Sequence, residues 1–231
     1  MAIDAAGYGR GNDQDHFALQ SGLTAVLNES AARAGLSRSR WAKQAMGDGE
    51  LAILPPGEPE PVVVDDYVRH LDEVLAAHNA HAPSRSKIRL RIAIHFGAAM
   101  PAENGYAGQG VVAVSRLVES AAIRSALAAS PLANIALILS RQVFDDIVRQ
   151  GHVSLSESDF TRAHVRVKEY QDEAWIRVVG EVPGTGQEQD EERPAQEDRA
   201  SAGQTVSQHF HGDVHAPHAV FGISHRTGRD G

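Results

Sequence analysis

Residues 45–54 read AMGDGELAIL, and residues 1–10 read MAIDAAGYGR. Each stretch joins an apolar run to a glycine-rich turn and carries one aspartate at the junction, Asp48 in the first and Asp4 in the second. The run ELAILP predicts a short buried strand, because apolar runs of this length bounded by turn residues are typical of covered strands. The two stretches therefore predict two strand ends that each present a carboxylate.

Two carboxylates at the ends of buried strands point to metal chemistry. Such a group is costly unless a cation pairs with it. Asp4 and Asp48 lie 44 positions apart, and if they converge they would suit Mg²⁺, whose shell is often completed by phosphate oxygens. Adjacent glycines would let backbone N–H groups approach an anion: Gly7, Gly9, Gly47 and Gly49. Ordinary tight turns use the same residue types, so at this point both interpretations stay open.

Composition narrows the class of protein. The 231 residues, 42% of them hydrophobic, can bury one substantial core. No long apolar run and no secretory pattern occurs, so we expect no membrane association. The absence of cysteine excludes disulfides and thiolate sites and fits a reducing compartment, so we expect a cytoplasmic protein. With 22 basic against 30 acidic residues, the net charge of −8 argues against nucleic acid as a partner.

The segment 180–204 divides the chain. It reads GEVPGTGQEQDEERPAQEDRASAGQ and carries seven acidic residues against two arginines, a local net charge of −5. It contains too little apolar surface to offset the entropy lost on ordering. We therefore predict a body at 1–179, an acidic disordered linker at 180–204 and a separate tail at 205–231.

Hydrophobic periodicity predicts the elements of the body. The apolar residues of KIRLRIAIHFG, residues 87–97, alternate with other residues, which is typical of a half-buried strand. Helices are predicted at 13–34, 65–78, 115–129 and 140–149, and further strands at 50–55, 134–139, 163–168 and 173–179, the last two joined by the hairpin connection EYQD. Strands and helices intermixed in this way indicate an α+β or α/β fold, with one sheet and helices packed on it.

Five segments, in order along the body, resemble the class III adenylate/guanylate cyclase catalytic domain. IDAAGYG and MGDGELA resemble the two metal-aspartate segments of that family, and RIAIHFG resembles the strand that it writes as RIGIHTG. GYAGQGVVAVSRLVES resembles its WGxxVNxASRLxxx helix start, and VRVK resembles a strand that ends in a phosphate-binding lysine. The resemblance implies an α+β, ferredoxin-like nucleotidyl cyclase core, built as one mixed sheet with packed helices.

The resemblance also implies an activity. A head-to-tail homodimer would convert a nucleoside triphosphate into a 3′,5′-cyclic nucleotide and pyrophosphate, at sites built across the dimer interface. Two Mg²⁺ or Mn²⁺ ions would be bound by Asp4 and Asp48, with the backbone carbonyl of Ala5 as a further ligand. A two-metal carboxylate site can both activate the attacking hydroxyl and stabilise the leaving group.

Further residues receive roles from the same resemblance. Arg116, by its place in VSRL, matches the transition-state arginine, and Lys168 matches the phosphate lysine. Taken alone, each would be interpreted as a solvated cation. The resemblance implies that four residues contact the substrate: Gly7, Tyr8, Gly9 and Gln44.

Several positions depart from the family pattern. Val112 stands where the family has an asparagine that orients the ribose, and valine cannot form a side-chain hydrogen bond. Gly105 takes the place of the acidic base-reading residue, and Gln44 that of its lysine or glutamate partner. Two hypotheses follow. The enzyme reads another base, as the pyrimidine cyclases of bacterial antiphage defence do, or the chain is a degenerate signalling adaptor that acts through nucleotide binding or its tail.

The tail is a separate motif. Residues 205–226, TVSQHFHGDVHAPHAVFGISHR, alternate apolar and polar residues around Pro217, which predicts strand, turn and strand. The stretch FHGDVHAPHAVFG is similar to terminal amyloid signalling motifs, which stack in register on a partner protein with a matching motif. The alternative is a plain disordered tail. Its histidines lack the spacing of a closed metal site, so metal binding is the weaker interpretation.

Overall fold

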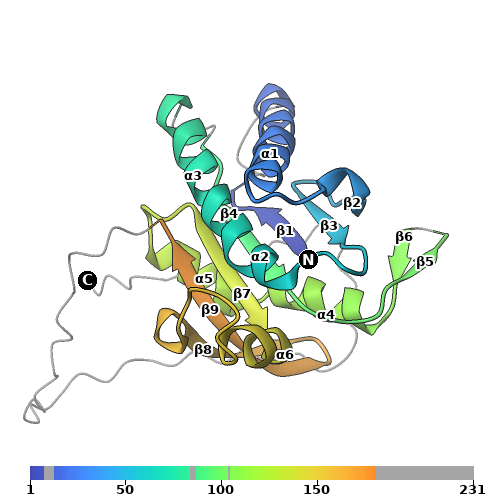
Figure 1. Cartoon of the computed structure of the whole chain (residues 1–231). Coiled ribbons are helices and arrows are strands. Elements are labelled where there is room, and N and C mark those ends of the chain that lie inside the picture. Colours follow the sequence, from blue (N-terminus) through green and yellow to red (C-terminus); the bar gives the residue numbers. More distant parts are fainter. Residues whose placement is uncertain (8–12, 84–86, 104, 181–231) are drawn as a thin grey trace, which may run out of the picture. The chain divides into compact units, whose positions relative to one another are not determined.

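The computed structural model describes residues 1–7, 13–83, 87–103 and 105–180 (Figure 1). Tyr8, Gly9, most of the predicted linker and the whole predicted tail lie outside these ranges. None of the helices in the described ranges has an apolar stretch long enough to cross a membrane.

A seven-stranded mixed sheet forms the centre of the fold (Figure 1). The parallel pair is β4–β7, and the other neighbouring strands run antiparallel. The first four strands and their helices form the split β-α-β-β-α-β motif of ferredoxin-like folds, which confirms the predicted fold class. In spatial order the strands are β2 (Ala42–Ala45), β3 (Gly49–Ile53), β1 (Ala2–Ala5), β4 (Leu90–Ile94), β7 (Ile135–Ser140), β9 (Tyr170–Val179) and β8 (Thr161–Val167).

Helices cover both faces of the sheet. The first face carries α1 (Asp13–Arg33), α2 (Glu60–Val64), α3 (Asp66–His81), α6 (Arg141–Val143) and a π-helical turn, Phe144–Val148. The second face carries α4 (Gln109–Val118) and α5 (Ala121–Ala129). A separate hairpin, β5 (Met100–Ala102) with β6 (Gly105–Ala107), projects from the body in Figure 1. Short 3-10 helices occupy Arg38–Arg40 and Glu157–Asp159.

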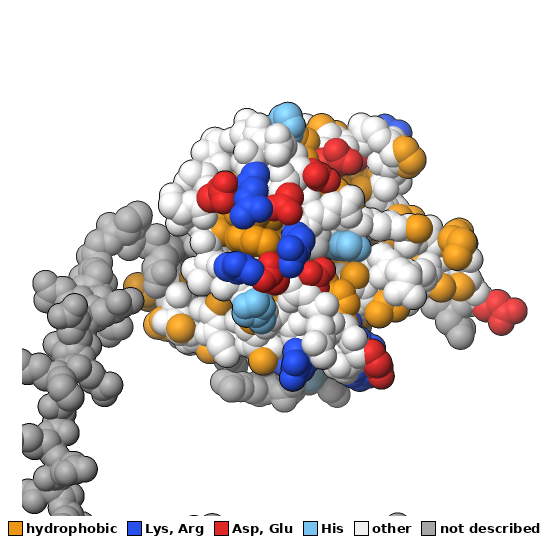
Figure 2. Space-filling model, turned by 90° about the horizontal axis from the view of Figure 1, so that it is seen from below, with side chains coloured by type: hydrophobic (Ala, Val, Ile, Leu, Met, Phe, Trp, Pro, Cys, Tyr) orange, Lys and Arg blue, Asp and Glu red, His pale blue; other side chains and the backbone are white. Residues whose placement is uncertain are grey.

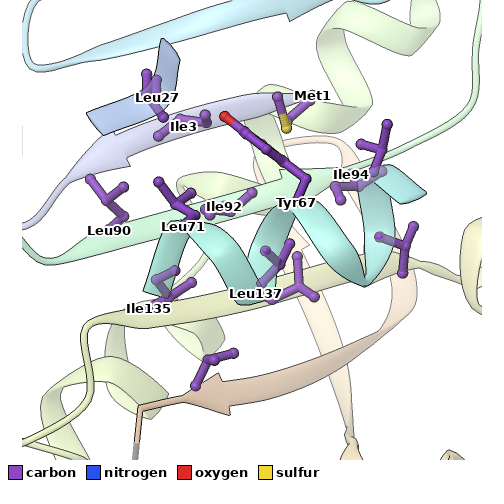
Figure 3. Close-up of a cluster of buried hydrophobic side chains, with 14 of the residues drawn as sticks. Met1, Ile3, Leu27, Tyr67, Leu71, Leu90, Ile92, Ile94, Ile135 and Leu137 are labelled. Carbon is purple, nitrogen blue, oxygen red and sulfur yellow. The ribbon is translucent and has the colours of Figure 1, made fainter. Parts of the chain in front are cut away.

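Two apolar cores hold these layers together. Figure 3 shows the first, in which Tyr67 and Leu71 of α3 lie over Ile92 of β4. The second core packs Leu117 of α4 against Ala93 of β4. The central strand β4 is therefore covered on both faces, and the predicted half-buried strand was wrong. Its alternation arises because large side chains face the first core, whereas the second face carries alanine and arginine.

Local signals fixed some element ends and missed others. Gly35 ends α1 with φ +72°, as its place in the sequence predicts. The single helix predicted at 115–129 is two helices, because Ser120 caps α5 by accepting a hydrogen bond from the Ile123 N–H at 3.4 Å. The predicted EYQD connection is also wrong: β9 begins at Tyr170, and the turn is Lys168–Glu169.

Candidate functional site

The strand register brings Asp4 and Asp48 to one place. Asp4 lies opposite Gly49 of β3 and opposite Arg91 of β4. The Ala5 N–H donates to the carbonyl oxygen of Asp48 at 3.0 Å. The two aspartates, far apart in sequence, are therefore backbone neighbours at the same end of adjacent antiparallel strands.

The glycines around the aspartates serve the backbone. Gly7 and Gly47 have φ +88° and +67°, a region that side chains disfavour. A Cβ atom on Gly49 would collide with the Ile3 carbonyl oxygen, so only glycine lets β3 approach β1 this closely. The turn interpretation of these glycines is therefore correct in part. It is compatible with a site, because the turn at Gly47 carries Asp48 and the turn at Gly7 directly follows the strand that carries Asp4.

Arg91 is the site residue that sequence reasoning missed. Its Nη2 forms an ion pair with Asp4 Oδ2, and the two side chains are only 16% and 23% exposed. Burial raises the pKa of Asp4 to about 6; the Asp48 carboxylate acts in the same direction, whereas Arg91 lowers it. The available signal was a basic residue in an apolar strand, since such a charge requires a partner.

The raised pKa of Asp4 predicts how pH affects the metal-free protein. Between the ordinary aspartate pKa of about 3.9 and about 6, the native state binds more protons than the unfolded state. The free energy of unfolding should therefore fall as pH rises through the native pKa of Asp4. Between pH 5 and pH 7.5, Asp4 alone should lower it by about 1 kcal/mol. Urea unfolding of the parent and of Asp4→Asn, both in a chelator, isolates this contribution. Identical pH profiles for the two proteins would contradict it.

The donor set suits a hard divalent ion. Carboxylates and a backbone carbonyl are the ligands that Mg²⁺ takes, and it keeps positions for water and phosphate. Within the described ranges, no group of three His, Cys, Asp or Glu side chains could hold a metal by itself. Asp4, Asp48 and the Ala5 carbonyl are donors of the type that fits such an ion, with water or phosphate oxygens in its remaining positions.

The two departures from the base-reading pattern lie together. Gln44 of β2 accepts a hydrogen bond from the Tyr106 N–H at 3.3 Å. A Cβ atom on Gly105 would overlap the Gln44 amide, so the glutamine occupies the space that a side chain at position 105 would need. Sequence reasoning identified both positions but not their contact. Of the other residues expected at the substrate, Gly7 is exposed in the turn after β1, whereas Tyr8 and Gly9 lie outside the described ranges.

Arg116 lies on the outer face of α4. Its Nη1 pairs with Glu119 Oε2 at 3.1 Å, one turn further along the chain. Val112, one turn earlier on the same face, is 45% exposed. Neither residue has a contact with Asp4 or Asp48 among the described interactions.

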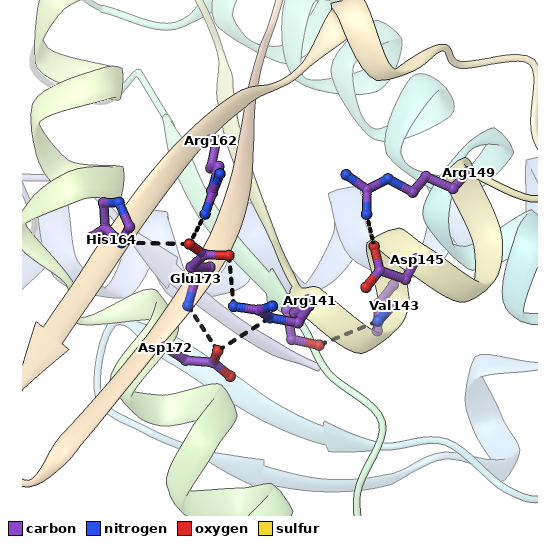
Figure 4. A network of polar contacts seen from close by, with 9 residues as sticks. Arg141, Val143, Asp145, Arg149, Arg162, His164, Asp172 and Glu173 are labelled. Atoms are coloured by element: carbon purple, nitrogen blue, oxygen red, sulfur yellow. Dashed lines mark hydrogen bonds and ion pairs between the residues drawn. The ribbon is translucent and has the colours of Figure 1, made fainter.

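Lys168 lies at the opposite edge of the sheet. It forms the turn between β8 and β9, with φ +53°, and three strands separate β8 from β1. Figure 4 shows ion pairs at this hairpin: Glu173 accepts from Arg162 and, at 2.6 Å, from Arg141. These contacts fix the strand that carries Lys168 and leave its own side chain exposed.

A cavity of about 310 Å³ lies away from these residues. Met1, Ile53 and His95 are among the residues that line it, at the end of β1 opposite to Asp4. This cavity and the paired carboxylates are therefore different places on the chain. Figure 2 shows charges of both signs interleaved on one face and hydrophobic side chains gathered toward the projecting β5–β6 hairpin.

Comparison with known proteins supports the fold. No protein-family model and no curated protein matches the sequence. The adenylate/guanylate cyclase/hydrolase from Silicibacter pomeroyi matches over 76% of this chain and 94% of its own, with 21% identity and a TM-score of 0.51. The catalytic core of a rhodopsin-guanylyl cyclase with converted specificity, in complex with ATPαS, matches over 78% and 93%, with 14% identity and a TM-score of 0.44. The chain has the fold of class III adenylate/guanylate cyclase catalytic domains.

Proposed function

We propose that the protein is a nucleotidyl cyclase, which converts a nucleoside triphosphate into a 3′,5′-cyclic nucleotide and pyrophosphate. The observation that carries the proposal is the convergence of Asp4 and Asp48 at adjacent strand ends of a cyclase-like sheet. The Silicibacter protein, described as an adenylate/guanylate cyclase/hydrolase, supports the reaction class by its fold.

The aspartates bind the catalytic metals in this proposal. Asp4, Asp48 and the Ala5 carbonyl hold two Mg²⁺ or Mn²⁺ ions. Such ions, when bound, activate the 3′-hydroxyl and stabilise the pyrophosphate leaving group. Gly7, exposed in the turn after β1, offers its backbone N–H to the phosphates, because glycine has no side chain and open space surrounds it.

A second copy of the chain completes the site. Arg116 and Lys168 are cations suited to phosphate oxygens, and the contacts described for one chain include none between either residue and the aspartates. In a head-to-tail homodimer, each active site takes its metals from one chain and these cations from the other. Exposed apolar side chains favour such an interface: Met46 in the same turn as Asp48, Val112 on the same helix as Arg116, and Met100 on β5.

A second candidate function is a cyclase-fold adaptor that binds nucleotide without turning it over. Val112 favours it, because this exposed position cannot form the hydrogen bond of the family's asparagine. The Gln44 contact with Tyr106 favours an altered base preference instead, since a polar side chain stands at the expected base-reading position and is held in place.

Product formation from each of the four nucleoside triphosphates separates the two candidates. With Mg²⁺ or Mn²⁺, we expect one triphosphate to give a cyclic nucleotide and an equal amount of pyrophosphate, detected by chromatography and mass spectrometry. Binding of a triphosphate with no product from any of the four would favour the adaptor. Neither binding nor product would overturn both.

A further inference from the structure

Two arginines point to the second face of the sheet and are held in different ways: Arg89, directly before β4, and Arg91 within it. Arg89 donates three hydrogen bonds to carbonyl oxygens around the end of α5: those of Leu127, Ser130 and Ala133, at 2.6 to 2.7 Å. Arg91 lies two residues further on and has one described partner, Asp4. Its Nε is buried and has no hydrogen-bond partner among the described residues. Arg89 therefore has a structural role, whereas Arg91 is held by a single carboxylate.

The carboxylate that holds Arg91, that of Asp4, is one of the two aspartates proposed to bind metal. Arg91 and Asp4 are directly opposite each other in the β1–β4 register, so the ion pair is built into the sheet. Asp48 brings a second negative charge to the same place, because its carbonyl oxygen bonds to the Ala5 N–H. In the metal-free protein, Arg91 is the cation with a described contact to these two aspartates, through Asp4.

We propose that Arg91 is the counter-ion of Asp4 in the metal-free protein and that a divalent cation displaces it. The inference rests on the proposed function, because it takes Asp4 as a metal ligand. Arg91 and the metal are then alternative partners of one carboxylate. Arg91 prevents an unpaired buried charge before metal binds, and it weakens metal binding by repulsion and by occupying Asp4 Oδ2. Metal binding in turn frees a guanidinium beside the site.

Mn²⁺ binding in the absence of nucleotide tests the inference, by calorimetry or by the electron paramagnetic resonance of free Mn²⁺. Arg91→Gln should bind Mn²⁺ about tenfold more tightly than the parent, because the repelling charge is gone. Arg91→Lys, which keeps the charge, should stay within about twofold of the parent. Arg162→Gln makes the same charge change at the far edge of the sheet and should bind like the parent. Equal or weaker binding by Arg91→Gln would overturn the inference.

Asp4→Asn distinguishes this inference from the proposed function. Mn²⁺ binding that Asp4→Asn leaves unchanged would overturn the metal assignment and the inference together. Binding that Asp4→Asn abolishes and Arg91→Gln does not strengthen would overturn the inference alone.

A measurement on the parent covers the case in which Arg91→Gln fails to fold. The NMR signal of the Arg91 Nε–Hε group can be assigned by its loss in Arg91→Lys. Its chemical shift should change when Mg²⁺ saturates the parent protein. The signal of Arg162 should stay in place. An Arg91 signal that does not move on saturation would overturn the inference.

Discussion

Asp48→Asn and Asp4→Asn should each lower the turnover of the best triphosphate by at least about a thousandfold. Each variant removes a negative oxygen ligand, and no third acidic or histidine side chain in the described ranges could replace it. The metal-free fold of Asp48→Asn should persist, because the Asp48 carboxylate repels Asp4 and contributes to its raised pKa. Product formation and thermal unfolding, measured on the same preparations, test both expectations.

Asp66→Asn is the matched control for these variants. Asp66 is a carboxylate on α3 that is 48% exposed and pairs with Arg69. Its replacement should leave turnover within about twofold of the parent, since exposed ion pairs contribute little. An Asp4→Asn or Asp48→Asn protein that turns over like Asp66→Asn would contradict the metal assignment.

Elements with a strong local signal could be predicted from the sequence. The apolar spacing of residues 13–34 and the glycine after it gave α1 and its end, and the apolar run at 134–139 gave β7. Ser140, the first residue of the helix predicted at 140–149, is the N-cap of α6, because its Oγ accepts from the Val143 N–H at 3.5 Å. These signals lie within a few residues of the elements that they determine.

Features that depend on tertiary contacts were not predicted from local patterns. The alternation in β4 suggested one exposed face, but α4 and α5 cover that face. The contact of Gln44 with Gly105 and Tyr106 joins segments about sixty residues apart, and no local pattern encodes it. The partner of Arg91 became visible only with the β1–β4 register, which a lone basic residue in a strand does not specify.

The candidate site was found from the sequence in part. Asp4 and Asp48 could be proposed as a pair because strand-end carboxylates need a cation, and the structure brings their backbones together. The roles of Arg116 and Lys168 came from the family resemblance and stay predictions, since the described interactions of one chain include no contact of either residue with the aspartates. The amyloid-like motif at 205–226 lies outside the described residues and also stays a prediction.

The composite site predicts complementation between two inactive variants. Asp48→Asn lacks a metal ligand and keeps Arg116, whereas Arg116→Ala keeps both aspartates. Each homodimer carries the same defect in both sites and should be inactive. A heterodimer should contain one site with all its residues and one with both defects, because a head-to-tail dimer takes Asp48 and Arg116 of each site from different chains.

The turnover of purified heterodimers is therefore the most direct test of a site shared between two chains. The two chains, carrying different affinity tags, are co-expressed and purified through both tags, and product formation is measured with the preferred triphosphate. The composite site predicts about half of the parent's activity per dimer, from the one intact site. Proven heterodimers that are as inactive as the two parent variants would contradict it.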